Sequence, residues 1–295
     1  MVDNECVMTS VWCGFLVGFI FRTRCFLKFD KMDSTLKSTF RVFCKLLYLF
    51  SLSIAQRIRR ISRMLRPEHF LNLEETEHAS LFKDLSRVWE GLKGLKDYVA
   101  TNVRPEQLHT TVGQPAFIGK NVFIGEGTVI EPGATILGPA IIGKNCQIRA
   151  NAYIRENVII GDHCVVGNAT EIKHSILFNH AVAPHFNYVG DSILGFHAHL
   201  GAGVKISNFK LTQDTIFVDD VDVHGMPIDT GMRKLGAVIG DYGEVGCNAV
   251  LNPGSLIGRH SIVYPNVCWR GILPDNMIVK NRAKQDVVVL RPREY

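Results

Sequence analysis

Aliphatic residues recur at every sixth position through the middle of the chain. The series runs without a gap over ten positions: Ile118, Ile124, Ile130, Ile136, Ile142, Ile148, Ile154, Ile160, Val166 and Ile172. An α-helix repeats every 3.6 residues and a flat strand alternates every two, so neither produces a period of six. A triangular coil does, because each hexad supplies one short strand and one turn, and three hexads close one coil.

A second series of mostly small residues follows four positions after each aliphatic residue. Its members are Val122, Thr128, Ala134, Ala140, Cys146, Ala152, Val158, Cys164, Thr170 and Ile176. Glycine follows the aliphatic residue at positions 119, 125, 143, 161 and 167, where a tight turn needs backbone freedom. The pattern predicts a mainly β fold, a left-handed parallel β-helix of hexapeptide repeats over residues 113–295, whose stacked coils bury one aliphatic column.

The period is interrupted twice after Ile172. Residues 177–187 carry polar and aromatic side chains where aliphatic ones are expected, and residues 209–233 form a polar insertion. Between and after these breaks the period returns in shifted registers: Leu194, Leu200 and Ile206, then Ile239, Val245, Leu251, Ile257 and Val263. Interruptions in a repeat usually mark loops that leave the stack and carry function. Residues 270–295 are expected to cover the last coil.

A helical segment is expected before the repeats. Residues 76–100 carry an apolar stripe at helical spacing: Leu81, Phe82, Leu85, Val88, Trp89, Leu92, Leu95 and Val99. We interpret residues 71–112 as a short helical N-terminal cap over the first coil, which otherwise exposes strand edges and core.

Residues 1–70 form a basic and apolar leader with 12 Lys and Arg against 5 Asp and Glu. The densest apolar run, residues 11–21, is short for a membrane span, which needs about 20 residues. Isoleucines interleaved with arginines over residues 54–66 favour a helix on an anionic membrane surface. The alternatives are a disordered leader and translation that begins at Met32. Peripheral attachment of residues 1–66 to the inner membrane face is therefore left open.

Charge and cysteine usage limit the remaining classes. The chain has a net charge of +5, but the leader contributes +7, so the rest carries −2 and does not suggest a nucleic-acid groove. The eight cysteines form no CxxC pair, which favours a reducing cytoplasm and predicts neither a disulfide scaffold nor a metal site.

Polar residues that a structural repeat does not need gather between the two interruptions: Arg155, Lys173, His185, Tyr188, His199 and Asn208. Three hexads separate Arg155 from Lys173, so the two cations should lie one above the other and point outward, where they suit a phosphate. His185 is a natural general base near neutral pH.

These residues lie in sequences that resemble a known family. The run EIKHSILFNHAVAPHFNYVGDSILG followed by HLGAGVKISN is similar to the acetyltransferase domain of bifunctional UDP-N-acetylglucosamine pyrophosphorylase/glucosamine-1-phosphate acetyltransferases. TGMRKLGAVIGD, after the insertion, is closer to archaeal-type sugar-1-phosphate nucleotidyltransferase/acetyltransferases. The resemblance covers roughly residues 117–282.

The resemblance implies roles for individual residues. His185 takes a proton from the sugar amine, and the amide of Ala202 stabilises the thioester oxyanion. The remaining assignments place Arg155, Lys173, Tyr188, His199, Asn208 and Lys234 at the substrate, and Cys247 and Arg282 at the coenzyme. His199 departs from the asparagine of the bacterial enzymes, and the insertion changes the wall near Lys234; both bear on which sugar is bound.

The expected activity is acetyl-CoA-dependent N-acetylation of an amino-sugar 1-phosphate, most simply glucosamine-1-phosphate, toward UDP-N-acetylglucosamine. The resemblance further implies a homotrimer. The first 110 residues hold no Gly-rich nucleotide loop, so no nucleotidyltransferase domain is expected in this chain. Two alternatives stand beside this one: a non-catalytic trimerising subunit for a separate nucleotidyltransferase, and a hexapeptide acyltransferase with another acceptor or a longer acyl donor.

Overall fold

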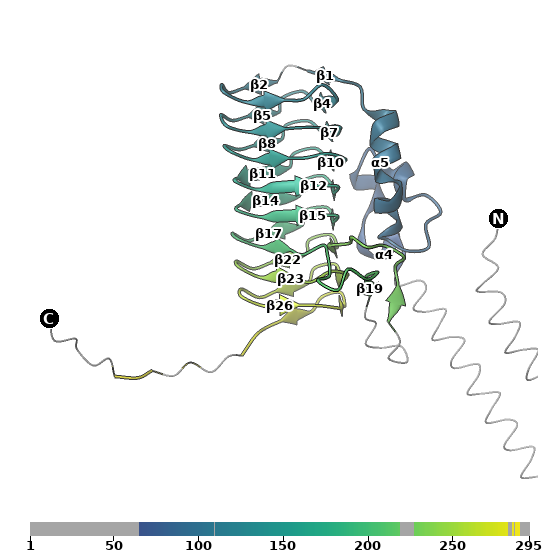
Figure 1. Cartoon of the computed structure of the whole chain (residues 1–295), viewed down its shortest axis with the longest axis vertical. Coiled ribbons are helices and arrows are strands. Elements are labelled where there is room, and N and C mark those ends of the chain that lie inside the picture. The colour runs from purple at the N-terminus through teal and green to yellow at the C-terminus, as the bar shows by residue number, and fades with distance from the viewer. Residues whose placement is uncertain (1–64, 109, 219–226, 283–284, 286, 290–295) are drawn as a thin grey trace, which may run out of the picture. The chain divides into compact units, whose positions relative to one another are not determined.

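The computed structural model describes residues 65–108, 110–218, 227–282, 285 and 287–289, all within one compact unit of residues 63–295 (Figure 1). Their main feature is a stack of triangular coils with one parallel sheet on each of three sides. Every neighbouring pair of strands within these sheets is parallel and links one coil to the next. The predicted left-handed parallel β-helix is confirmed.

Each coil contributes one short strand to each side. We name the sides sheet A, sheet B and sheet C. Sheet A consists of β1 (Glu106–Gln107), β4 (Val122–Ile124), β7 (Ala140–Ile142), β10 (Val158–Ile160), β13 (Ile176–Leu177), β16 (Ile193–Leu194), β21 (Ala237–Ile239), β24 (Ser255–Ile257) and β27 (Ile272–Leu273). Sheet B consists of β2 (Thr111–Val112), β5 (Val129–Ile130), β8 (Gln147–Ile148), β11 (Val165–Asn168), β14 (Val182–His185), β17 (His199–Leu200), β22 (Glu244–Val245), β25 (Ile262–Val263) and β28 (Ile278–Val279). Sheet C consists of β3 (Phe117–Ile118), β6 (Thr135–Ile136), β9 (Tyr153–Ile154), β12 (Glu171–Lys173), β15 (Tyr188–Gly190), β18 (Lys205–Ile206), β23 (Val250–Leu251) and β26 (Cys268–Trp269).

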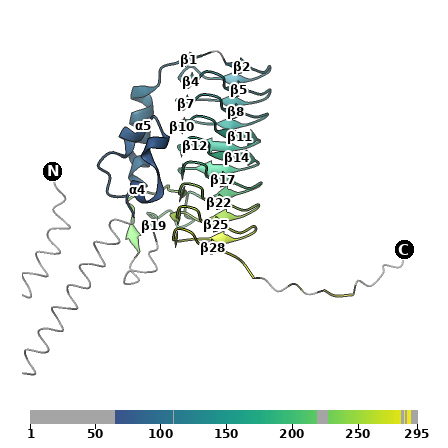
Figure 2. The ribbon, with the colours of Figure 1, turned by 180° about the vertical axis from the view of Figure 1, so that it is seen from behind.

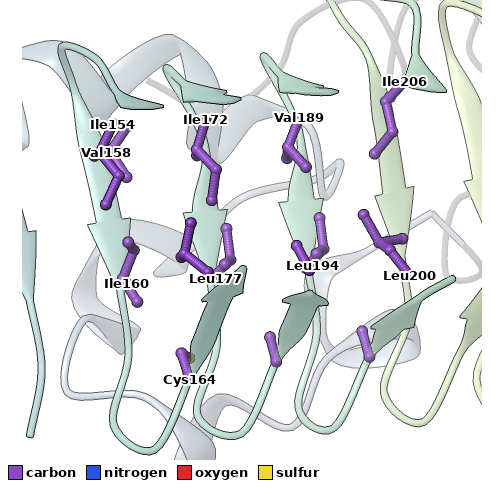
Figure 3. Close-up of a cluster of buried hydrophobic side chains, with 14 of the residues drawn as sticks. Ile154, Val158, Ile160, Cys164, Ile172, Leu177, Val189, Leu194, Leu200 and Ile206 are labelled. Carbon is purple, nitrogen blue, oxygen red and sulfur yellow. The ribbon is translucent and has the colours of Figure 1, made fainter. Parts of the chain in front are cut away.

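The aliphatic column fills the interior of the stack. Figure 3 shows Ile154, Ile160 and Ile172 pointing inward beside the side chains of the next coils. From Ile124 to Ile172 the residues of the six-residue series are at most 1% exposed. Small residues at the corners also bond the neighbouring coil; the Thr128 hydroxyl, for example, donates to the Gly143 carbonyl at 2.7 Å. Each coil buries its inward-pointing aliphatic side chains against those of the next coil. The stack is therefore stabilised by a repeating series of nearest-neighbour contacts.

Sheet A is apolar on its outer face as well. Side chains that alternate with the column are also buried there: Ile141, Ile159, Ile176, Ile193, Val238 and Leu256. The cover includes α4 (Pro67–Phe70), the short 3₁₀ turns η1 (Leu73–Glu75) and η2 (Ala79–Phe82), and α5 (Glu90–Asn102). Phe82 packs on Phe178, with ring centroids 5.5 Å apart.

The helical segment therefore differs from the prediction in extent and in place. The expected helix over residues 76–100 is wrong in its first half, because the chain turns at Asp84, where φ is 61°, and α5 begins only at Glu90. The expected cap over the first coil is also wrong: α5 lies along the side of the stack beside sheet A (Figures 1 and 2). Most of the apolar stripe is buried, but beside sheet A instead of over the first coil, and Leu81 and Leu85 are half-buried.

Residues 177–187 do not leave the stack, contrary to the expectation. They form β13 and β14 and pair with the coils on both sides. The change of rhythm comes from a shorter turn between sheets C and A: Ile160 pairs with Leu177 and Ile172 with Val189, seventeen positions apart instead of eighteen.

The insertion does leave the stack, between β18 and β21. Its described part contains β19 (Phe217–Val218) and β20 (Ile228–Asp229), which pair antiparallel. A backbone bridge between Phe209 and Lys234 closes its base.

The two ends of the chain also bear on earlier expectations. The expected C-terminal cover is not formed by the described residues: positions 272–279 belong to the last coil, and Val287, Val288 and Val289 are 81–99% exposed. The leader, with its membrane-surface interpretation, lies almost entirely outside the described residues. Within the described part, no helix is both long and apolar enough to cross a membrane.

Candidate functional site

The short turn between sheets C and A holds a buried ion pair. Lys173 ends β12, and its Nζ lies 3.2 Å from Oδ2 of Asp191, which occupies the same turn one coil later. The two residues are only 9% and 5% exposed. Asp191 adopts a left-handed backbone conformation with φ 49°, which aspartate tolerates better than most residues. The shortened turn thus sets the carboxylate directly beside the ammonium group.

Asn208 and Tyr188 extend this pair into a chain of polar contacts. The Asn208 amide donates a hydrogen bond to the same oxygen, Asp191 Oδ2. The Asn208 side chain also forms a hydrogen bond with the Tyr188 hydroxyl. Burial, followed by the charges of Glu171 and Asp191, raises the pKa of Tyr188, and the bond with Asn208 acts in the opposite direction. Tyr188 is therefore a neutral phenol at physiological pH, able to donate or accept a hydrogen bond.

Arg155 carries its own carboxylate partner. Nη1 donates to Glu171 Oε1 at 3.1 Å, and Nη2 lies 3.5 Å from Glu156 Oε1. Glu171 is the main cause of the raised pKa of Arg155. The predicted stacking of Arg155 on Lys173 is found, since the Arg155 amide donates to the Ile172 carbonyl. The expectation that both cations point outward is wrong for Lys173, which is buried against Asp191, whereas Arg155 is partly exposed and held by Glu171.

The corner between sheets B and C carries a second set of predicted residues. His185 ends β14 with an exposed ring, and its backbone carbonyl accepts from Gly203 N–H at 2.9 Å. Ala202 therefore lies in the same corner one coil later, and its amide has no acceptor within the described residues. Cys247 lies in the coil after that, where the neighbouring Asn248 amide donates to the Ala202 carbonyl.

The remaining predicted residues are more dispersed. Lys234 is exposed at the base of the insertion, where the amide of the next residue, Leu235, donates to the Asn208 carbonyl at 3.0 Å. His199 lies on sheet B, between Val182 and Glu244 of the adjacent coils. Arg282 is exposed beyond β28, and the structure does not bring it to the others. The predicted residues thus form two sets around sheet C. The set with Lys173 and Tyr188 lies on the face of sheet C and along its edge with sheet A. The set with His185 lies along its edge with sheet B.

Two carboxylates in this region were missed by the sequence reasoning. Glu171 holds Arg155, and Asp191 holds Lys173 and Asn208. Glu171 could have been found from the alternation of side chains along a strand, because it lies two residues before Lys173 and therefore on the same face. Asp191 could have been found by counting a seventeen-residue coil from His174. Among the described residues, no group of three or more His, Cys, Asp or Glu side chains could hold a metal ion.

Comparisons with known proteins fall on the same region. Residues 136–231 match the family model described as the GMPPB C-terminal domain. A bifunctional sugar-1-phosphate nucleotidylyltransferase/acetyltransferase of Sulfurisphaera tokodaii is 36% identical over 97 residues, which are 33% of this chain and 23% of that protein. The bifunctional protein GlmU of Methanococcus maripaludis strain C7 is 36% identical over 128 residues, 42% of this chain and 29% of that protein. The resemblance to the β-helix part of such proteins is confirmed, and the chain spans less than a third of the length of these relatives.

Solved structures with some similarity are acyltransferases. A perosamine N-acetyltransferase from Caulobacter crescentus, in complex with CoA and GDP-perosamine, is 20% identical with a TM-score of 0.23, over 58% of this chain and 53% of that one. The Arabidopsis UDP-N-acetylglucosamine acyltransferase is 12% identical with a TM-score of 0.33, over 58% of this chain and 65% of that one.

Proposed function

We propose that this chain is an acetyl-CoA-dependent N-acetyltransferase whose acceptor is an amino-sugar 1-phosphate, with glucosamine-1-phosphate as the first substrate to test. One observation carries the proposal. His185 shares one corner of the stack with the Ala202 amide, which has no acceptor among the described residues. Lys173, Tyr188 and Asn208 lie across the adjoining sheet. A base and an oxyanion donor thus stand beside a polar surface suited to a sugar phosphate.

The reaction needs no covalent intermediate on the protein. The sugar amine attacks the thioester carbonyl, a C–N bond forms, the C–S bond breaks, and the sulfur leaves with a proton as free coenzyme A. The exposed imidazole of His185 accepts the proton that the amine loses and returns it to the departing sulfur. The Ala202 N–H donates to the thioester oxygen as negative charge develops on it, which stabilises the transition state more than the ground state.

The acceptor surface carries little net charge, which restricts how a phosphate is bound. Arg155 and Lys173 contribute two positive charges, and Glu156, Glu171 and Asp191 contribute three negative ones. The phosphate would therefore gain hydrogen bonds from Arg155 and Tyr188. The N–H groups that Lys173 and Asn208 do not give to Asp191 would add further bonds, and exposed Lys234 at the base of the insertion would add charge.

Coenzyme A release tests the proposal. The full chain is incubated with acetyl-CoA and, separately, with glucosamine-1-phosphate, galactosamine-1-phosphate and a UDP-linked amino sugar, and free thiol is measured. Release with one sugar phosphate and none with the UDP-linked sugar is the expected result. Absence of release with every acceptor would overturn the proposal.

A second function is favoured by the same charge balance. In a non-catalytic subunit that trimerises a separate sugar nucleotidyltransferase, both cations would be structural, each neutralised by its carboxylate. We propose a homotrimer in either case, because flat sheet faces of a prism pack well around a threefold axis. Sedimentation equilibrium at micromolar concentration separates a trimer from a monomer, and the thiol assay separates the enzyme from the subunit.

A further inference from the structure

The carboxylate of Asp191 lies at the centre of the acceptor surface. Its Oδ2 accepts from Lys173 Nζ at 3.2 Å and from Asn208 Nδ2. Its backbone is fixed on both sides, since its amide donates to the Lys173 carbonyl at 3.0 Å and its carbonyl accepts from Gly236 N–H at 2.8 Å. The carboxylate therefore has little freedom to move, and neither do the two groups it holds.

The contacts of Asp191 reach Tyr188 through Asn208, because the Asn208 side chain also forms a hydrogen bond with the Tyr188 phenol. Gly190 lies beside both groups and leaves little free space there: a Cβ on Gly190 would lie 2.8 Å from the Tyr188 hydroxyl and 2.8 Å from Asn208 Nδ2. Three residues of the proposed acceptor surface, Lys173, Asn208 and Tyr188, are thus linked to one carboxylate.

The turn itself does not need an acidic residue. The left-handed position of other turns in the stack is taken by uncharged residues, among them several asparagines: Asn145, Asn151, Asn157, Asn248, Asn266 and Asn276. Burying a charged pair is costly in free energy and is often no better for stability than a neutral substitute. A buried aspartate here is therefore best explained by what it does to its neighbours.

We propose that Asp191 is a positioning residue for the acceptor, which aims the Lys173 ammonium and the Asn208 amide at the sugar phosphate. This inference rests on the proposed function and deepens it. Asp191 itself need not touch the substrate, because both of its side-chain contacts are to residues that would. Two residues at the base of the insertion also hold this region. Gly236 N–H donates to the Asp191 carbonyl, and Leu235 N–H donates to the Asn208 carbonyl.

The test is the substitution Asp191→Asn, which keeps the shape and removes the charge. We expect the KM for the sugar phosphate to rise about tenfold, the worth of one charge-assisted contact. The KM for acetyl-CoA and kcat should change less than about twofold, since the B–C corner is not altered. Asp162→Asn is the matched control, because the Asp162 carboxylate also caps a coil turn, accepting the Lys144 amide at 2.7 Å, but at the A–B corner. Its KM values should match wild type.

A double-mutant cycle with Lys173→Met separates positioning from a general structural role. In the Lys173→Met background, Asp191→Asn should add less than about threefold to the KM, because the main group it orients is already gone. This double variant has no unpaired buried charge, so it serves if the single variant fails to fold. Full additivity of the two substitutions, or an Asp191→Asn variant with a lowered Tm and an unchanged KM, would overturn the inference.

Binding of glucosamine-1-phosphate, measured by calorimetry without acetyl-CoA, separates the two proposals. Wild-type binding without turnover would contradict the proposed acetyl transfer but leave the role of Asp191 open to measurement, with about tenfold weaker binding expected for Asp191→Asn. Equal binding by wild type and Asp191→Asn, or no binding by either, would contradict the role of Asp191.

Discussion

The imidazole rings of His180 and His197 stack with their centroids 4.6 Å apart and their planes 17° from parallel. His163 stacks on the other side of His180 at 4.8 Å, and Tyr242 and His260 continue the column at 5.3 and 4.8 Å. All five occupy left-handed turn positions between sheets A and B, so the coils place one ring above the next. Neutral rings stack well here, whereas protonated neighbours repel each other.

Acid is therefore expected to destabilise the fold. The pKa of His180 is lowered below 6.5 by burial and then by His197 and His163, while Glu75 and Asp162 act in the opposite direction. Because the unfolded chain takes up this proton first, the stabilisation is complete above about pH 6.5 and is lost as the pH falls below it. Burial lowers the pKa of His78 and His174 too, with the same sign. Thermal unfolding should give a lower Tm at about pH 5.5 than at about pH 7.5.

Substitution of His180 by Asn provides the control, because asparagine already occupies the same turn at Asn145. The drop in Tm between the two pH values should shrink in His180→Asn and stay as in wild type in His185→Asn, whose ring is exposed at another corner. Buried Asp241, with its raised pKa, contributes the opposite sign and is unchanged in both variants. An identical acid-induced drop in wild type and His180→Asn would contradict the assignment.

Replacement of glycine by alanine should have opposite effects on the free energy of unfolding at Gly167 and at Gly94. A Cβ on Gly167 would clash with the carbonyl oxygen of Pro184 in the next coil, so the backbones must separate. Gly167→Ala should lower the free energy of unfolding by about 3 kcal/mol or more. A Cβ on Gly94, on the exposed side of α5, would meet only Leu81 Cδ1 at 3.6 Å. Gly94→Ala should therefore stabilise the protein by about 0.5–1 kcal/mol. Urea unfolding of both variants checks the pair, and destabilisation by Gly94→Ala would show that α5 is not helical at this point.

The repeat was readable from the sequence because its information is local. Ile124, Ile142 and Ile160 each point inward for the same reason, that a short strand between two tight turns leaves them no other direction. The cover over sheet A was not readable to the same degree. The apolar residues from Leu81 to Trp89 have the spacing of a helix, but the chain turns at Asp84. The tertiary contact of Phe82 with Phe178 favours that path, and the local sequence does not show it.

The candidate site shows the same limit at the scale of one residue. The eighteen-residue count correctly stacked Arg155 on Lys173, and it failed one coil later because the next coil has seventeen. Gly190, and not Asp191, pairs with Lys173, so the aspartate lies in the turn beside the lysine. A shortened turn leaves only a small trace in the sequence, yet it decides whether a cation is free or buried in an ion pair.

Substitutions in the aliphatic column should reduce the free energy of unfolding much more than substitutions on the outer face of the sheets. Ile148 is fully buried in the column, and Val129 is 40% exposed on the outer face of sheet B. Ile148→Ala should reduce the free energy of unfolding by about 2–5 kcal/mol through lost burial and the cavity left behind. Val129→Ala should change it by about 0.5 kcal/mol or less in the isolated chain. Similar values for the two variants would show that the column does not carry the stability.

Replacing Lys173 should affect both binding and stability. Removal of the ammonium leaves the Asp191 carboxylate buried, with Asn208 as its one remaining side-chain donor among the described residues. Loss of one partner costs about 3–5 kcal/mol in other buried pairs. Lys173→Ala is thus expected to lower Tm as well as raise the KM for the sugar phosphate. An unchanged Tm would indicate that water reaches Asp191 in the folded protein.

His185 should behave differently, because among the described residues its imidazole makes no hydrogen bond or ion pair, and its ring contact is with exposed Phe186, 6.3 Å away between centroids. The ring is exposed, and its backbone bonds to Asn187 and Gly203 do not depend on the imidazole. His185→Ala should therefore keep the Tm and lower kcat by about 10²–10⁴-fold, the usual contribution of a positioned general base. The KM for the sugar phosphate should change little, since proton transfer belongs to the transition state and not to binding. His199→Ala is the matched control: it removes another exposed histidine of sheet B, and it should alter the preference among amino sugars with a much smaller loss of kcat. Near-wild-type turnover of His185→Ala on every amino-sugar phosphate tested would remove the base from the mechanism and favour the non-catalytic subunit.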